Sequence, residues 1–426
     1  MSTPAPSSPS IFPVLLVNFI GMLGYSIVIP LLVFLVQDFG GNEVIYGLMG
    51  AVYPTFQLIG APLLGRWSDQ IGRRRVLMIS QAGTFLAWGL FIIALMLPVT
   101  GLFTVESSML GTFLVSVPLL LLFLARALDG LTGGNVSVAN AYLSDVSTEK
   151  NRKANFGKMG SSTSLGFVIG PVLAGLLGAS VLGELLPVMV AAGISLVAIF
   201  VIFRFLPESR PELVPANWRE LHLSKLFHVE HKECYDMEDC QDTTFRSLIR
   251  QPRFILLFGI YFFTFLGFSF YYASFPVYAS SSLGWNTSQL GIYFAVYSGI
   301  MVVIQGPGLG YLSSRVNSRW LVLIGSVLMG LSFVLLPQPG MVWVWMGVVF
   351  LSVGNALMWP SFLAILSEAG TKNNQGTIQG YANSTGSLAS ILGMVLGGVL
   401  FSVLGPSVFY LSATFLVIIA ALSFRL

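Results

Sequence analysis

The sequence predicts an all-α membrane protein of twelve transmembrane helices, arranged as two pseudo-symmetric six-helix bundles. Three observations predict this class: the composition, the long apolar runs and an internal repeat. Hydrophobic residues make up 55% of the 426 and charged residues only 9%, whereas soluble domains carry about 25% charged residues. So little charge cannot cover so much apolar surface, which excludes a soluble fold.

Each apolar run is long enough to cross a bilayer as a helix, which takes roughly 20 residues. The runs are too long for barrel strands, which alternate and span about ten residues. The first run is interpreted as a span rather than a removed signal peptide, because it ends without a small-residue cleavage site. The expected spans are 11–36, 44–64, 76–97, 118–143, 157–181, 184–206, 254–279, 288–312, 319–337, 341–367, 376–403 and 405–424.

The two halves repeat each other. Ala141–Leu177 aligns without a gap with Ala364–Leu400, and polar loop residues are among the identities. We therefore expect an N-terminal bundle over 1–206, a cytoplasmic linker over 207–253 and a C-terminal bundle over 254–426. Such parallel repeats are typical of transporters that place the substrate near the bilayer midplane between the halves. Residues 98–117 have no counterpart, so we expect an outer-loop insertion, such as a short amphipathic helix.

The basic residues indicate the orientation. Apart from Arg126, every one of the 21 Lys and Arg residues falls on one side of the predicted spans, and the opposite loops contain none. Basic loops face the cytoplasm. We therefore expect a multi-pass protein of the cell (inner) membrane, with both termini in the cytoplasm.

Two charged residues lie deep in one span. Arg126 and Asp129 are three residues apart, so they share a helix face. Ionisable groups inside spans cost about 2.5–3.5 kcal/mol on insertion scales and mark function. One interpretation is a proton site in which Asp129 titrates and Arg126 tunes it. The other is a permanent ion pair that only orients the helix. The second half has no such residue, so proton coupling would have to lie in the first.

Small residues and polar aromatics suggest further roles. Gly166, Gly170, Pro171 and Gly175 form a stripe that permits close helix contact, and we expect a tight, kinked contact with a helix of the other half. The alternative is ordinary packing.

The expected substrate-binding groups are polar or aromatic residues in the spans: Asn18, Tyr25, Tyr53, Gln57, Tyr271, Tyr272, Tyr293, Tyr297, Gln305, Asn355 and Trp359. The alternative for each residue is packing or an anchor at the membrane interface. Such a cavity suits a bulky amphipathic or cationic molecule.

All His and Cys residues lie between His222 and Cys240 in the linker. Zinc or copper accept these ligand types, but the spacing fits no tetrahedral motif. We therefore expect chance clustering and no metal site, with a metal-regulated linker or a metal-ion exporter as the alternative.

Three motifs resemble those of the major facilitator superfamily. Gly65–Leu77, GRWSDQIGRRRVL, resembles the signature of the loop between the second and third helices. Leu124–Gly134, LARALDGLTGG, resembles the fourth-helix motif. Gly166–Gly175, GFVIGPVLAG, resembles the fifth-helix motif of drug–proton antiporters. Together with the spans and the repeat, the resemblance covers nearly the whole chain and implies that family's twelve-helix fold.

The stretches GYSIVIP and RALDGLTGGNVSVANAYLSD are similar to the tetracycline-exporter branch. That branch commonly has an acid in the first span where this chain has Gly21, which argues against tetracycline as the substrate. The family's pattern also implies a cytoplasmic latch, with Asp69 near the start of span eleven and Arg73 reaching Asp145. The implied gating residues are Gly65, Asp69, Gly72, Arg73, Arg74, Asp145, Gly166, Gly170, Pro171 and Gly175.

These observations favour a transporter rather than an enzyme. We expect proton-coupled efflux of a small organic compound, drug-like or amphipathic, by alternating access. The alternatives are a facilitator or symporter of an endogenous metabolite, and a metal-linked transporter or sensor. The expected partners are the small-molecule substrate, protons and the bilayer, with no cofactor or nucleic acid, and the chain is expected to act as a monomer.

Overall fold

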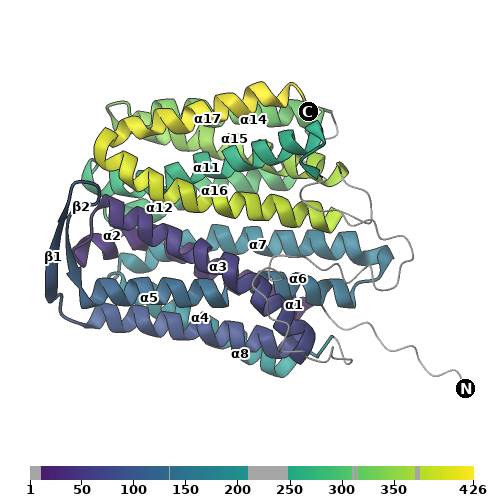
Figure 1. The fold of residues 1–426 in the computed structure, drawn as a ribbon, viewed down its shortest axis with the longest axis horizontal. Helices are drawn as coiled ribbons and strands as arrows, with labels where there is room; N and C mark the ends of the chain where they lie inside the picture. The colour runs from purple at the N-terminus through teal and green to yellow at the C-terminus, as the bar shows by residue number, and fades with distance from the viewer. Residues whose placement is uncertain (1–10, 134, 210–247, 309–311, 313–314, 370–374) are drawn as a thin grey trace, which may run out of the picture. The chain divides into compact units, whose positions relative to one another are not determined.

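A computed structural model describes residues 11–133, 135–209, 248–308, 312, 315–369 and 375–426, and its chain is almost entirely helical (Figure 1). The N-terminal helices are α1 (Phe12–Ile27), α2 (Ile29–Asp38), α3 (Glu43–Ile71), α4 (Arg73–Met96), α5 (Val117–Thr132), α6 (Asn135–Val146), α7 (Glu149–Gly178) and α8 (Leu185–Phe205). The C-terminal elements are α11 (Pro252–Ser281), α12 (Thr287–Val303), η3 (Ile304–Gly308), α14 (Ser318–Leu335), α15 (Met341–Glu368), α16 (Gln375–Leu404), η4 (Gly405–Ser407) and α17 (Val408–Ser423).

Helical segments occupy all twelve predicted spans, and within the described ranges ten stretches are long and apolar enough to cross a membrane. One of these stretches, Ile378–Ser423, contains both α16 and α17, whereas α12 is shorter than a span and continues into η3. The first and fourth spans each consist of two consecutive helices. The chain is therefore a multi-pass membrane protein, and the count of twelve crossings stays a prediction.

The insertion at 98–117 is a β-hairpin and not the amphipathic helix that we expected. Strands β1 (Gly101–Ser107) and β2 (Gly111–Ser116) form a two-stranded sheet. Asn42 holds the hairpin at its turn, because its Nδ2 donates to the carbonyl oxygens of Leu110 (2.7 Å) and Thr112 (3.3 Å). Both strands are rich in β-branched and aromatic residues, including Phe103, Thr104 and Val105 in β1 and Thr112 and Phe113 in β2, and such residues favour strands.

The chain divides into two compact units. The first comprises Met1–Leu35, Thr55–Phe103 and Val115–Phe227. Within it, α1 packs against α7 and α8, and α4 packs against α5, α6 and α8. The buried core of this unit includes an apolar cluster with Val17, Leu77, Val138, Tyr142 and Ile202. This packing brings α1, α4 and α5 together around the deeply placed charges.

The second unit comprises Val36–Pro54, Thr104–Leu114 and His228–Leu426. Within it, α14 packs against α15 and α17, and α11 packs against α16 and α17. Its interior is rich in aromatic rings. Phe275 stacks on Tyr293 with ring centroids 4.2 Å apart, and Tyr271 stacks on Phe275 at 5.3 Å. The proposed boundaries of the two bundles at 206 and 254 stay predictions.

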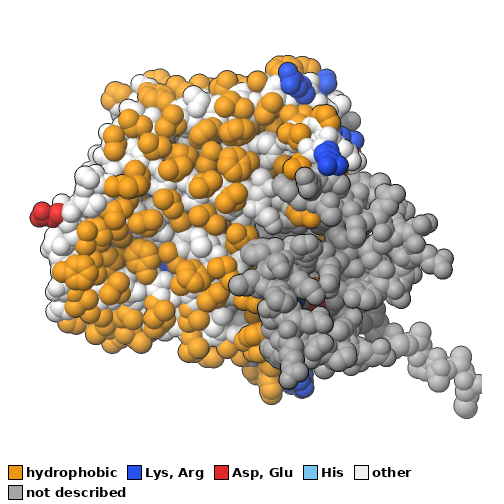
Figure 2. Space-filling model, viewed as in Figure 1, with side chains coloured by type: hydrophobic (Ala, Val, Ile, Leu, Met, Phe, Trp, Pro, Cys, Tyr) orange, Lys and Arg blue, Asp and Glu red, His pale blue; other side chains and the backbone are white. Residues whose placement is uncertain are grey.

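The outer faces of the helices are apolar. Figure 2 shows hydrophobic side chains over most of the face in view, with Lys and Arg gathered toward one end. Leu86 on α4, Phe200 on α8 and Val417 on α17 expose 59–64% of their surface. Lipid chains solvate such side chains well, so this surface fits a bilayer and not water.

Local sequence explains how α3 turns into α4. Gly72 lies between them with φ of +101°, a conformation that costs glycine little and other residues much. The turn places the three arginines that follow it at the start of α4. It also leaves the backbone N–H groups of the first turn of α4 without partners in the helix.

Candidate coupling and gating sites

The two deeply placed charges lie together on α5. Arg126 Nη1 is 3.7 Å from Asp129 Oδ2, and the two side chains are 5% and 11% exposed. Among the described residues, these two and Arg73 are the charged residues classed as buried. The pair therefore has the position that the sequence predicts for it, and its role in proton coupling stays a prediction.

Neighbouring helices complete the surroundings of this pair. Thr84 on α4 donates its hydroxyl hydrogen to Asp129 Oδ1 over 3.0 Å. The guanidinium of Arg126 lies 6.0 Å from the centre of the Tyr25 ring on α1, within the range of a cation–π contact. Thr84 is not among the site residues that the sequence predicts. A single threonine in an apolar span indicates a polar contact inside the membrane. The sequence does not show that this contact is with Asp129, because that depends on how α4 is rotated about its axis.

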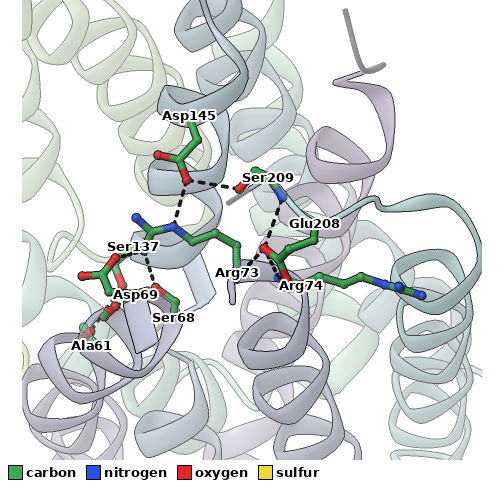
Figure 3. Close-up of polar contacts among 10 residues, drawn as sticks. Ala61, Ser68, Asp69, Arg73, Arg74, Ser137, Asp145, Glu208 and Ser209 are labelled. Atoms are coloured by element: carbon green, nitrogen blue, oxygen red, sulfur yellow. Dashed lines mark hydrogen bonds and ion pairs between the residues drawn. The ribbon is translucent and has the colours of Figure 1, made fainter. Parts of the chain in front are cut away.

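The second charged network lies where α3 ends and α4 begins (Figure 3). Arg73 Nη1 is 2.7 Å from Asp69 Oδ1, and Arg73 Nε donates to Asp145 Oδ2 on α6 over 3.1 Å. Arg73 also donates to the hydroxyl of Ser68. The contact of Arg73 with Asp145 that the motif implies is therefore present. The expected contact of Asp69 with span eleven stays a prediction.

Two residues after α8 extend this network, and neither is among the site residues that the sequence predicts. The carboxylate of Glu208 accepts the backbone N–H of Arg73 (2.8 Å) and of Arg74 (3.2 Å). The hydroxyl of Ser209 donates to Asp145 Oδ2 over 3.1 Å. Glu208 thus satisfies unpaired donors of α4, where the helix dipole favours an anion. Both residues fall within the predicted linker over 207–253, so their role beside α4 could not be recognised from the sequence.

The side chain of Arg74 turns toward α8, where it donates to the carbonyl oxygens of Phe203 and, at 3.4 Å, Ile202. Gly65 on α3 has open space where a Cβ would be placed, whereas a Cβ on Gly72 would lie 2.4 Å from Glu208 Oε2. Gly72 is therefore required both by its backbone conformation and by the carboxylate beside it.

The small-residue stripe on α7 packs against α1. A Cβ on Gly166 would lie 2.5 Å from the carbonyl oxygen of Phe19, and one on Gly170 would lie 2.0 Å from Ser26 Oγ. Both helices belong to the first unit, so the expected partner, a helix of the other half, is wrong for these two glycines. Pro171 lies inside α7, and Gly175 is buried on the same helix.

The candidate substrate groups of the first unit are engaged by neighbouring helices. Asn18 Nδ2 donates to Thr163 Oγ1 (2.8 Å) and Ser162 Oγ (3.2 Å) on α7. Gln57 Nε2 donates to the carbonyl oxygen of Gly133 over 3.1 Å. Tyr25 lies beside Arg126. The structure therefore brings Tyr25, and not Asn18 or Gln57, to the charged pair.

The candidates of the second unit fall into two hydrogen-bonded pairs and one ring cluster. Tyr271 donates to Tyr293 over 3.1 Å, and Asn355 Nδ2 donates to Tyr297 Oη over 2.6 Å. Trp359 packs edge-on against Tyr261 and Phe265. The remaining candidates are Tyr272 on α11, whose ring stacks on Phe294, Tyr53 on α3, and Gln305 in η3.

One further aromatic residue was missed. Tyr261 donates to Asn383 Oδ1 over 2.7 Å and packs on Phe265 as well as on Trp359.

The His and Cys cluster at 222–240 lies outside the described residues. Among those that are described, no group of three or more His, Cys, Asp and Glu could hold a metal ion.

Comparison with known proteins supports the resemblance. The family model described as "Major Facilitator Superfamily" matches residues 257–426, and that described as "Ion channel regulatory protein UNC-93" matches residues 91–339. Tetracycline resistance protein, class D, of Salmonella ordonez is 26% identical over 392 residues, which cover 91% of this chain and 88% of that protein. Multidrug resistance protein 2 of Bacillus subtilis (strain 168) is 26% identical over 398 residues, which cover 92% of this chain and 89% of that protein.

A solved structure shares the fold. The human organic anion transporter MFSD10 (TETRAN) superposes with a TM-score of 0.65 at 18% sequence identity, covering 97% of this chain and 98% of that one. The motifs, the helical architecture, the family model and these relatives agree. The chain belongs to the major facilitator superfamily, a family of membrane transporters and not of enzymes.

Proposed function

We propose that this transporter exports a small organic compound, drug-like or amphipathic, in exchange for protons by alternating access. The observation that carries the proposal is the setting of Asp129: a carboxyl group inside a span, with Thr84 and Arg126 as its partners. An ionisable group inside a span costs free energy of insertion, and residues of this kind therefore mark functional sites. The relatives named for tetracycline and multidrug resistance support the same substrate class.

Charge explains how a proton and a substrate could exclude each other. With Asp129 ionised, its charge and that of Arg126 cancel. With Asp129 protonated, the guanidinium beside Tyr25 is left uncompensated, in surroundings where Coulomb interactions are stronger than in water. A cationic substrate would then be repelled from this part of the first unit. Binding of a proton and of such a substrate would therefore alternate, as antiport requires.

We also propose that the network of Asp69, Arg73 and Asp145 acts as a gate. These charges hold α3, α4 and α6 together at one end of the first unit. Opening that end requires the two carboxylates to part from Arg73. The close contact of α7 with α1 at Gly166 and Gly170 would let these two helices move as one body. The aromatic and amide groups of α11, α12 and α15 remain the proposed substrate contacts of the second unit.

Purified protein in liposomes tests the proposal. A pH gradient is imposed across the membrane, and ethidium or tetracycline is added while an entrapped dye reports internal pH. The proposal expects one of these compounds to dissipate the gradient faster in protein-containing vesicles than in empty ones. Transport of a compound down its own gradient without any proton movement would instead identify a facilitator and contradict proton coupling.

One observation favours a second candidate substrate class, organic anions. Arg126 places a guanidinium in the interior of the first unit, and the human protein of the same fold is named as an organic anion transporter. In the same assay, p-aminohippurate serves as the anionic probe. A response to p-aminohippurate and none to ethidium would favour this candidate over export of cations.

A further inference from the structure

Four uncharged side chains of fully buried residues in the first unit have polar atoms without a hydrogen-bond partner among the described residues. They are both amide atoms of Gln81, the indole Nε1 of Trp88, the hydroxyl of Tyr142 and Oδ1 of Asn18. Their side chains are buried, with residue exposures of 1%, 2%, 0% and 4%. Buried polar groups in proteins are almost always bonded to protein or to ordered water. A set of four in one helical unit therefore calls for an explanation.

Two of these side chains, Gln81 and Trp88, lie on either side of Thr84, which donates a hydrogen bond to Asp129. Gln81 precedes Thr84 on α4 by three residues and Trp88 follows it by four, so all three lie near one face of the helix. The ring of Trp88 lies against α1, where a Cβ on Gly24 would be 3.6 Å from its Cζ2 and 3.9 Å from its Nε1. Gly24 is next to Tyr25, over whose ring Arg126 lies.

Tyr142 extends the series toward the Arg73 network. It lies on α6, which packs against α4, and it belongs to the same apolar cluster as Leu77, one turn before Gln81. Asp145, which accepts from Arg73, follows Tyr142 by one turn of α6. The polar groups thus run from the level of Trp88, past Thr84 and Gln81, to the end of the unit that the sequence predicts to be cytoplasmic.

We propose that ordered water occupies this interior tract, bonded to Gln81 and Tyr142, and that it carries the proton between Asp129 and the Arg73–Asp145 end of the unit. The glutamine amide can donate to one water and accept from another, and the tyrosine hydroxyl can do the same. The carboxyl group of Asp129 passes its proton to the nearest water and becomes a carboxylate. The proton then leaves along the hydrogen-bonded waters. This role rests on the proposed proton coupling, whereas the hydration does not.

Radiolytic labelling tests the hydration directly. A brief X-ray pulse converts bound water to hydroxyl radicals, which oxidise adjacent side chains, and mass spectrometry locates the products. In H₂¹⁸O the products carry ¹⁸O if the internal water exchanges with solvent. Trp88 and Tyr142 should be labelled despite their burial, and Gln81→Leu should lower both rates severalfold. Thr264→Val is the matched control, since Thr264 is equally buried but bonded within its own helix to Ile260. It should leave both rates unchanged.

The variants must also be folded and must bind substrate. Gln81→Met, of similar volume, replaces Gln81→Leu if the latter unfolds below the wild-type temperature. In liposomes, Gln81→Leu or Gln81→Met should slow substrate-driven proton flux about tenfold without weakening substrate binding. Phe409 on α17 is fully buried and serves as the reference for a dry ring. Labelling of Trp88 and Tyr142 no faster than that of Phe409, after correction for intrinsic reactivity, would overturn the hydrated tract. Labelling with unchanged proton flux would overturn its role as a proton route. If wild-type protein moved no protons at all, the proposed function would fail while labelling still decided the hydration.

Discussion

Thr84 on α4 donates a hydrogen bond of 3.0 Å to Asp129 on α5. This bond joins two helices at the one acidic residue that is buried among those described. A hydrogen bond to a charged group is worth about 1.5–3 kcal/mol. We therefore expect Thr84→Val to lower the unfolding temperature in detergent more than Thr264→Val, whose hydroxyl bonds only to its own helix. Equal losses in the two variants would contradict the assigned role of the bond.

Gly170 tests the contact between α7 and α1. A Cβ there would lie 2.0 Å from Ser26 Oγ and 2.8 Å from the backbone nitrogen of Ile27, so α7 must move. Overpacking of this kind costs about 1–3 kcal/mol, and we expect Gly170→Ala to lower stability and transport together. Gly160→Ala, on the same helix with open space around it, should be neutral or gain up to about 1 kcal/mol. Thermal unfolding of both variants checks the prediction, which fails if they behave alike.

Arg73 should not be replaceable by lysine. Its guanidinium reaches Asp69, Asp145 and Ser68 at once, and a lysine ammonium cannot reproduce that fork. We expect Arg73→Lys to slow substrate transport in liposomes with little change in substrate affinity. The exposed neighbour Arg75 provides the control, because Arg75→Lys keeps the basic loop intact. Comparable activity of the two variants would remove Arg73 from the gate.

Glu208 should stabilise the first turn of α4. Its carboxylate accepts from two backbone N–H groups there, and such capping contributes about 0.5–2 kcal/mol. Glu208→Gln should therefore lower the unfolding temperature and increase hydrogen exchange at Arg73 and Arg74. Glu106→Gln, in the exposed hairpin strand β1, should do neither. Unchanged exchange at the start of α4 would show that the cap is dispensable.

The helices could be predicted because the signal for each one lies within its own segment of sequence. A run of apolar residues as long as Leu185–Phe205 has few alternatives to a spanning helix. The hairpin was missed because the insertion was interpreted by exclusion, from its lack of a counterpart in the second half. Its stretches LFTVES and TFLVS are rich in β-branched and aromatic residues, and this enrichment is a strand signal.

The site was predictable where it depends on spacing within one helix, and not where it depends on how helices are rotated or joined. The spacing of Arg126 and Asp129 places both on one face of α5. No spacing indicates that Thr84 faces Asp129, that the glycines of α7 face α1, or that Glu208 returns from the end of α8 to the start of α4. The contact of Arg73 with Asp145 could be anticipated only through the family motif.

The central claim is that Asp129 carries the coupled proton. Proteoliposomes with an imposed pH gradient and an entrapped pH-sensitive dye measure this most directly, with ethidium or tetracycline added to start exchange. Wild-type protein should dissipate the gradient when substrate is added. Asp129→Asn, which keeps the volume of the side chain but cannot carry the proton, should bind the substrate without dissipating the gradient. An Asp129→Asn variant that dissipates the gradient as fast as wild type would contradict the account.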